Sequence, residues 1–228
     1  GFGQSNGYKG AAKMIAAFTP YVAGKMGVAE DQVSFDDETF RAAGSNLTPS
    51  FLDLAEMARE DGRLDLLRHQ ARATLPARSY PNGGHVAEVE IDSDTGVVTV
   101  ERYSVVDDFG NLINPMLAEG QVHGGVAQGI GQAITEHVVY DDNGQLLTGS
   151  FMDYAMPRAD DIPLVRFDTE AVPSTANAMG MKGCGEAGTV GALAAVANAV
   201  QDALWDQGVR QADMPFTPQR VWEMLNHN

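Results

Sequence analysis

The sequence holds one cysteine, Cys184, among 228 residues, and basic side chains are scarce. A single cysteine excludes an intrachain disulfide and a metal site built from several thiolates. Lys and Arg number 15 against 31 Asp and Glu, which gives a formal net charge of −16. Because nucleic acids and anionic membrane surfaces attract basic proteins, this balance argues against both as partners. No apolar run approaches the roughly 18 residues that cross a membrane, so we expect no membrane insertion.

The first residues lack an initiator methionine and the pattern of a signal peptide. The chain opens as Gly1-Phe2-Gly3-Gln4, whereas a secretory signal joins a basic segment to an apolar one. We therefore expect this chain to be a fragment of a longer protein or a processed subunit.

The hydrophobic pattern predicts a mixture of helices and hairpins. Alternation of apolar residues over His85–Ile91 and Val97–Val105, separated by an Asp-Ser-Asp-Thr-Gly turn, predicts an antiparallel hairpin. Elsewhere we expect a short hairpin at 32–40, a strand at 164–168, and helices at 10–26, from Thr48-Pro49, at 117–135, from 187 to near 205 and from Thr217-Pro218. This order indicates an α+β fold with a mostly antiparallel sheet.

The most informative stretch is Met181–Thr189, Met-Lys-Gly-Cys-Gly-Glu-Ala-Gly-Thr, which runs into an Ala-rich helix. Its glycines let the backbone approach a bulky ligand, and the start of the helix supplies free N–H groups. Glu186 is therefore a candidate catalytic base. The alternative is that Glu186 only complements the helix dipole, an effect of about 0.3–1 kcal/mol.

A second informative stretch is Ala118–Gln132, a predicted helix with five glycines. Each glycine costs a helix on the order of 1 kcal/mol relative to alanine, so something must come close to it. We expect Gly120, Gly124 and Gly131 near one face, where close packing against another helix is the simpler explanation. Gln121 and Gln128 lie two turns apart, and their amides can bind the edge of a heterocycle.

The segment Gly3-Gln4-Ser5-Asn6-Gly7 matches Gly-x-Ser-x-Gly, the nucleophile motif of the α/β-hydrolases. That motif requires a strand before the serine, and only two residues precede Gly3. A run of small polar residues before a helix serves better as a nest for phosphate oxygens. His85 and His123 are isolated histidines, and no pair of His or Cys has the spacing of metal ligands.

Three segments together resemble the C-terminal part of the molybdenum-binding subunit in the xanthine dehydrogenase, aldehyde oxidase and carbon monoxide dehydrogenase family. They are the hairpin and its exit, 84–115, the segment Glu119–Gly131, and Lys182–Gly188. The resemblance covers nearly the whole chain, and the family's fold is the α+β fold expected here. It implies one C-terminal molybdopterin-binding domain over residues 1–228. We expect two subdomains, about 1–80 with the C-terminal helices and about 81–180.

The resemblance implies a molybdopterin cofactor, in its cytosine dinucleotide form, whose dithiolene holds the metal without a protein ligand. In the family the residue that matches Glu186 lies beside the metal and is the base in the oxidation of an aldehyde or N-heterocycle by water-derived oxygen. Gln121 matches the glutamine that binds the pterin. The other residues expected at the cofactor are Gly3, Gln4, Ser5, Asn6, Lys182, Gly183, Cys184 and Gly185.

The chain departs from the family pattern in two ways. Gln4-Ser5-Asn6 stands where the family has Ser-Arg-Ser, so a phosphate-pairing charge is absent, and nothing in this sequence matches the N-terminal portion of the much longer family subunit. We therefore expect an inactive chain that needs the rest of the subunit and separate iron–sulfur and FAD modules in a hetero-oligomer. A bacterial cytoplasmic location follows from the resemblance, with the periplasm as the alternative. A non-catalytic module with the same fold and a serine hydrolase using Ser5 are the competing interpretations.

Overall fold

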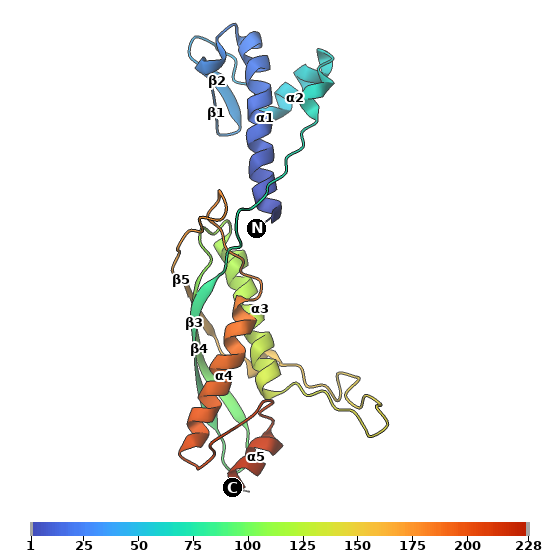
Figure 1. Cartoon of the computed structure of the whole chain (residues 1–228), viewed down its shortest axis with the longest axis vertical. Helices are drawn as coiled ribbons and strands as arrows, with labels where there is room; N and C mark the ends of the chain where they lie inside the picture. Colours follow the sequence, from blue (N-terminus) through green and yellow to red (C-terminus); the bar gives the residue numbers. More distant parts are fainter. Residues whose placement is uncertain (1, 227–228) are drawn as a thin grey trace. The chain divides into compact units, whose positions relative to one another are not determined.

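The computed structural model describes the backbone of residues 2–226 and the side chains of residues 7–226. The chain divides into two compact units, Gly1–Ala77 and Arg78–Asn228 (Figure 1). Each unit has a hydrophobic core of its own. No helix among residues 2–226 combines the length and the apolar character needed to cross a bilayer.

The first unit joins two helices to a hairpin. It contains α1 (Phe2–Met26), β1 (Val33–Asp36), β2 (Thr39–Ala42) and α2 (Phe51–Glu60), with short 3-10 helices at Glu30–Gln32 and Leu64–Leu67. The predicted hairpin is confirmed, and its two-residue turn, Asp37-Glu38, has the positive φ angles of 46° and 58° that such turns require. Four aromatic rings pack together in or against its core, with neighbouring centroids 4.8–5.9 Å apart, those of Phe18, Phe35, Phe40 and Phe51.

Both helices of this unit begin at other residues than the sequence predicts. α1 begins at Phe2 instead of Gly10, because no proline interrupts the first ten residues. α2 begins at Phe51 instead of Pro49, because Ser50 and Asp53 form a capping box: the Ser50 N–H donates to Asp53 at 2.9 Å and the Asp53 N–H donates to Ser50 at 3.3 Å. Pro49 instead accepts a hydrogen bond from the N–H of Phe40 in the hairpin.

The second unit is a three-stranded sheet covered by helices. β3 (Asn82–Ile91) and β4 (Val98–Asp108) form the predicted antiparallel hairpin, and β5 (Val165–Thr169) joins the other edge of β4 in parallel. α3 (Pro115–Ile134) and α4 (Ala187–Trp205) lie side by side on the sheet (Figure 1). Alternate residues of β4 are buried and exposed, so one face of the hairpin packs on the core and the other does not.

The C-terminal helices belong to this second unit and not, as predicted, with residues 1–80. The apolar face of α4 is buried in the core that β4 and α3 form. α5 (Pro218–Asn226) closes the end of the hairpin, where its backbone comes so near Gly96 that a Cβ there would lie 2.1 Å from the Pro218 carbonyl. The residues of α4 that are buried in the core are Ala192, Val196, Val200 and Leu204. The predicted α+β class is confirmed.

Candidate functional site

The predicted site residues of the second unit gather at one end of it. α3 and α4 run in parallel, so their N-termini lie at the same end, where β3 begins and β4 and β5 finish (Figure 1). The side chain of Asn114 caps α3 by accepting a hydrogen bond from the Leu117 N–H at 3.1 Å. Two helix starts therefore present free backbone N–H groups at this end.

Glycines bring the backbones of α3 and α4 into contact. A Cβ at Gly125 would lie 2.8 Å from the Thr189 nitrogen, one at Gly129 would lie 2.5 Å from the Ala192 Cβ, and one at Gly188 would lie 2.4 Å from the Val122 carbonyl. These positions serve close helix packing, the simpler of the two explanations that the sequence offered.

The glycines predicted on one face of α3 differ in their surroundings. No described atom lies within 4 Å of the Cβ position at Gly120 or Gly124, so both are open to an approaching ligand. Gly131 instead packs against Pro157 and the Glu136 carboxylate. Gly131 follows Gly124 by about two turns, so the three glycines can share one face of α3 while lying at different heights along it.

Glu186 is the residue directly before α4, and its side chain is exposed. Within the described part of the chain its carboxylate makes no capping hydrogen bond to the helix. The neighbouring Gly183 and Gly185 have no described atom within 4 Å of their Cβ positions. The Glu186 side chain is thus exposed to solvent beside glycines that leave space around the backbone. A capping hydrogen bond to α4 does not explain why a carboxylate stands at this position.

Lys182, a residue of the predicted motif, forms a largely buried ion pair with Asp108 that the sequence does not predict. The Asp108 carboxylate also accepts hydrogen bonds from the N–H groups of Gly110 and Val172, both at 2.9 Å. Burial alone would raise the pKa of this carboxyl, but the Lys182 ammonium and the two backbone donors outweigh burial and lower the pKa to about 2. The Lys182 amine, predicted to contact a cofactor, is therefore engaged within the chain.

The remaining predicted residues of this end differ in exposure. Gln121 is exposed on the first half of α3. Gln128 accepts a hydrogen bond from the Thr189 hydroxyl at 3.2 Å, which ties α3 to α4. Cys184 is half-buried and packs against the core. His123 Nε2 lies 3.9 Å from Glu119 Oε1, and the imidazole packs edge-on against the Phe167 ring. Both contacts of His123 are therefore made within this unit.

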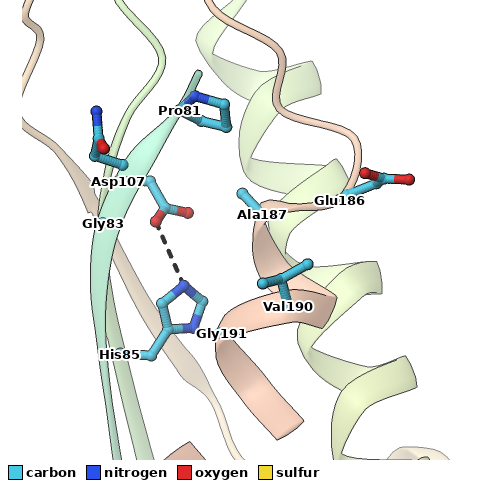
Figure 2. A pocket seen from close by; sticks show the side chains of 9 residues that line it. Pro81, Gly83, His85, Asp107, Glu186, Ala187, Val190 and Gly191 are labelled. Atoms are coloured by element: carbon cyan, nitrogen blue, oxygen red, sulfur yellow. Dashed lines mark ion pairs between the residues drawn. The ribbon is translucent and has the colours of Figure 1, made fainter. Parts of the chain in front are cut away.

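Sequence reasoning missed a buried network under the start of α4. His85 lies on β3, with its Nδ1 2.7 Å from the Tyr103 hydroxyl and its Nε2 3.4 Å from Asp107 Oδ1. The side chains of His85 and Asp107 are only 7% and 2% exposed. Figure 2 shows His85 and Asp107 on the sheet side and Glu186 at the start of α4, around one cavity of about 230 Å³.

The network could have been found by counting along the hairpin. His85 stands opposite Val105 in the register, so Tyr103 and Asp107 are its two diagonal neighbours on the same face. Gly191 makes room for the imidazole, because a Cβ there would lie 2.4 Å from the ring.

The N-terminal candidates for cofactor binding belong to the first unit. Gly3, Gln4, Ser5 and Asn6 fall in the first turns of α1, and their side chains lie outside the described residues. The helical backbone around Ser5 is not the strand-to-helix turn that the hydrolase motif requires. Among the described residues no group of three or more His, Cys, Asp or Glu could hold a metal ion.

Comparisons with known proteins agree on one family. A model described as a molybdopterin cofactor-binding domain matches residues 7–163. The nicotine 6-hydroxylase large subunit of Paenarthrobacter nicotinovorans is 46% identical over 142 residues, 62% of this chain and 17% of that protein. The 6-hydroxypseudooxynicotine dehydrogenase complex subunit gamma of the same organism is 36% identical over 198 residues, 84% of this chain and 25% of that protein.

Solved structures agree with these relatives. The crystal structure of a Cu,Mo-CO dehydrogenase aligns with a TM-score of 0.83 at 31% identity, over 96% of this chain and 28% of that chain. This chain spans no more than about a quarter of the length of the two curated relatives above.

Proposed function

Because the chain belongs to the molybdopterin cofactor-binding domain family of xanthine dehydrogenase- and carbon monoxide dehydrogenase-type oxidoreductases, we propose a role in catalysis. In this proposal the chain supplies the catalytic carboxylate and one half of the cofactor site of a molybdenum hydroxylase. The observation that carries this proposal is the position of Glu186. Its carboxylate is exposed beside two open glycines at an end where two helices begin.

The residues at this end suit a large anionic cofactor. Open glycines on α3 and in the segment before α4 allow a close approach, and the free N–H groups of the helix starts favour phosphate and other negative groups. Gln121 offers an exposed amide to the pterin, and Gly183 and Gly185 offer exposed backbone.

The role of Glu186 is that of a general base. The bound cofactor supplies the two-electron oxidation, and the oxygen that enters the product comes from water. Glu186 accepts the proton that this oxygen loses during transfer, and its carboxylate suits this role because it makes no capping hydrogen bond within the described part of the chain. The ion pair of Lys182 with Asp108 fixes the segment that carries Glu186.

The substrate class is an aldehyde or an N-heterocycle. The name of the most identical relative described above, nicotine 6-hydroxylase, favours the N-heterocycle. The remainder of the subunit completes the cofactor site, and iron–sulfur and FAD modules on partner chains carry the electrons away. We further infer that the cofactor is the cytosine dinucleotide form and that the chain alone is inactive.

Replacing Glu186 in the complete enzyme tests this proposal. We expect Glu186→Gln to keep its molybdenum and pterin, measured by elemental and cofactor analysis, while kcat falls by about 10²–10⁴-fold. Glu101→Gln, which changes an exposed carboxylate on β4, is the matched control and should leave kcat unchanged. Near-normal turnover of Glu186→Gln would remove this residue from the mechanism, and a wild-type enzyme without molybdenum would favour the non-catalytic module.

A further inference from the structure

Residues 136–158 form an arm that leaves the C-terminal end of α3 and extends away from the helices and the sheet of the second unit (Figure 1). Because α3 has 20 residues, it is about 30 Å long, and the arm lies at the other end of this helix from the candidate site. The arm contributes no residue to the cavity beside Glu186. It is therefore a feature separate from that site.

Hydrogen bonds within the arm give it a defined conformation. The Leu147 N–H donates to the Val139 carbonyl at 2.8 Å, and the Val139 N–H donates to the Thr148 hydroxyl at 3.0 Å. At the base of the arm the Tyr154 hydroxyl donates to the Glu136 carboxylate. No residue of the arm, all of which the structure describes, belongs to the hydrophobic core of the second unit. The arm is thus held in shape by its own hydrogen bonds.

The apolar side chains of the arm are exposed. More than a quarter of the exposed large apolar side chains of residues 7–226 lie in the arm, which is only about a tenth of the chain. Phe151 and Met152 are 83% and 93% exposed. Single exposed apolar side chains are ordinary on a protein surface, whereas a concentration of them indicates an interaction site. The exposed apolar residues of the arm are Val138, Tyr140, Leu146, Leu147, Phe151, Met152 and Met156.

The charge of the chain indicates what kind of partner fits this surface. The formal net charge of −16 opposes contact with a second copy of the chain. The arm itself carries four carboxylates against one guanidinium, which argues against an anionic membrane surface as well. A polypeptide surface with an apolar centre and Lys or Arg at its rim complements the arm. The charged residues of the arm are Glu136, Asp141, Asp142, Asp153 and Arg158.

A cavity of about 520 Å³ at the base of the arm has the same character. Phe151 and Met156 belong to its apolar lining, and the carboxylates of Asp160 and Asp161 outnumber the guanidinium of Arg158. A Lys or Arg side chain combines an apolar stem with a cationic end. Such a side chain of the partner therefore suits this cavity.

The lengths of similar proteins indicate where this partner comes from. The alignment with the Cu,Mo-CO dehydrogenase covers 96% of this chain but only 28% of that chain. The uncovered share of this chain is smaller than the arm, so most of the arm has a counterpart in a polypeptide more than three times as long. The additional polypeptide of such a subunit offers the surface that the arm lacks here.

We propose that the arm is a docking surface whose exposed apolar side chains pack against the rest of the molybdenum subunit. The proposal rests on the proposed function, because the rest of the subunit is what completes the cofactor site. Contact at the far end of α3 holds the two parts of the subunit together without occupying the site. Since the arm already has a defined conformation, docking costs little ordering of its backbone.

The first test identifies what the arm contacts. Phe151→p-benzoylphenylalanine places a photoreactive group on the arm in the purified complete enzyme that contains this chain. Irradiation should crosslink this position to peptides of the molybdenum subunit outside these 228 residues, which mass spectrometry identifies. Crosslinks to a second copy of this chain, crosslinks to an iron–sulfur or FAD chain, or no crosslinks at all would overturn the proposal.

The second test compares the chain alone with the complete enzyme. Hydrogen peroxide oxidises exposed methionines in preference to covered ones, so we expect oxidation of Met152 to be at least about 10-fold slower in the complete enzyme than in the chain alone. Equal rates in the two samples would show that nothing covers the arm and would overturn the proposal.

The third test removes the apolar contact with Phe151→Ser and Met152→Ser together. Both side chains are exposed, so the thermal midpoint of the chain alone should not change. In the complete enzyme the midpoint should fall and Met156 should be oxidised faster than in the wild type. Asn143→Ser, at the polar tip of the arm, is the matched control and should behave as the wild type. An unchanged midpoint and an unchanged oxidation rate in the complete enzyme would contradict docking through this surface.

The outcomes separate this inference from the proposed function. If Glu186→Gln abolishes turnover while position 151 crosslinks to a second copy or to nothing, the docking surface is wrong and the proposed function stands. If Glu186→Gln keeps its turnover, the proposed function fails, whatever the arm contacts.

Discussion

At the scale of single residues, the sequence predicts a role for a polar side chain of the second unit only where that residue belongs to a recognisable motif. Glu186 stands out in the sequence because glycines flank it and a helix follows. Asp107 and Asp108 do not stand out, because their roles depend on partners 22 residues upstream in the hairpin and 74 residues downstream. Only the register of β3 and β4 reveals the first pairing, and only the folded chain reveals the second.

Asp108 gives a prediction on acid stability. Its pKa of about 2 lies below the ordinary value of 3.8, so its ionisation stabilises the fold above about pH 4, and this contribution is lost as the pH falls toward 2. We expect Asp108→Asn to lower the free energy of unfolding by about 2 kcal/mol at neutral pH.

The measurement is urea unfolding of the purified chain at several pH values. Asp108→Asn should show a smaller loss of stability between pH 4 and pH 2 than the wild type does. Asp94→Asn, a change at an exposed carboxylate in the hairpin turn, is the control and should stay within about 0.5 kcal/mol of the wild type. Equal stability of Asp108→Asn and wild type at neutral pH would contradict the assigned role.

At the scale of elements, the existence of each helix and strand was predictable, and the boundaries less so. The hairpin of β3 and β4 has strict alternation and a turn rich in Asp and Gly, and the sequence locates it within three residues at each end. The start of α2 was misplaced because two signals compete: Thr48-Pro49 matches a helix start, and Ser50 with Asp53 matches one as well. The parallel pairing of β5 is a long-range contact that no local pattern contains.

The glycines of α3 give a prediction at this scale. Gly125→Ala would place a Cβ 2.8 Å from backbone of α4, so we expect it to destabilise the chain by about 1–3 kcal/mol. Gly120→Ala meets no described atom within 4 Å and should stabilise the chain by about 0.5–1 kcal/mol through its helix propensity. Thermal unfolding of the two variants compares them directly, and the same sign for both would contradict the packing described here.

At the scale of the whole molecule, the division into two units follows from two separate cores. The sequence predicted two parts but assigned the C-terminal helices to the first, because order along the chain does not reveal which apolar faces meet. Since each unit buries its own apolar residues, we expect the connection near residues 77–78 to be more susceptible to proteolysis than either unit.

Limited trypsin digestion tests this division. Arg78 is exposed at the boundary, so brief digestion should yield a stable fragment that starts at Ser79 and keeps the sheet with α3, α4 and α5. Mass spectrometry identifies the fragment, and circular dichroism reports its fold. Early cleavage inside α3 or α4, with no accumulation of this fragment, would show that the second unit does not hold together alone.

The contact between α3 and α4 through backbone atoms has a consequence for how such a chain can change over time. Where glycines bring two helix backbones into contact, even the methyl group of alanine would clash with the neighbouring helix. Even the smallest substitution there should therefore be destabilising. Substitutions should therefore be tolerated better in connecting segments and on outward faces than at the contact between the two helices.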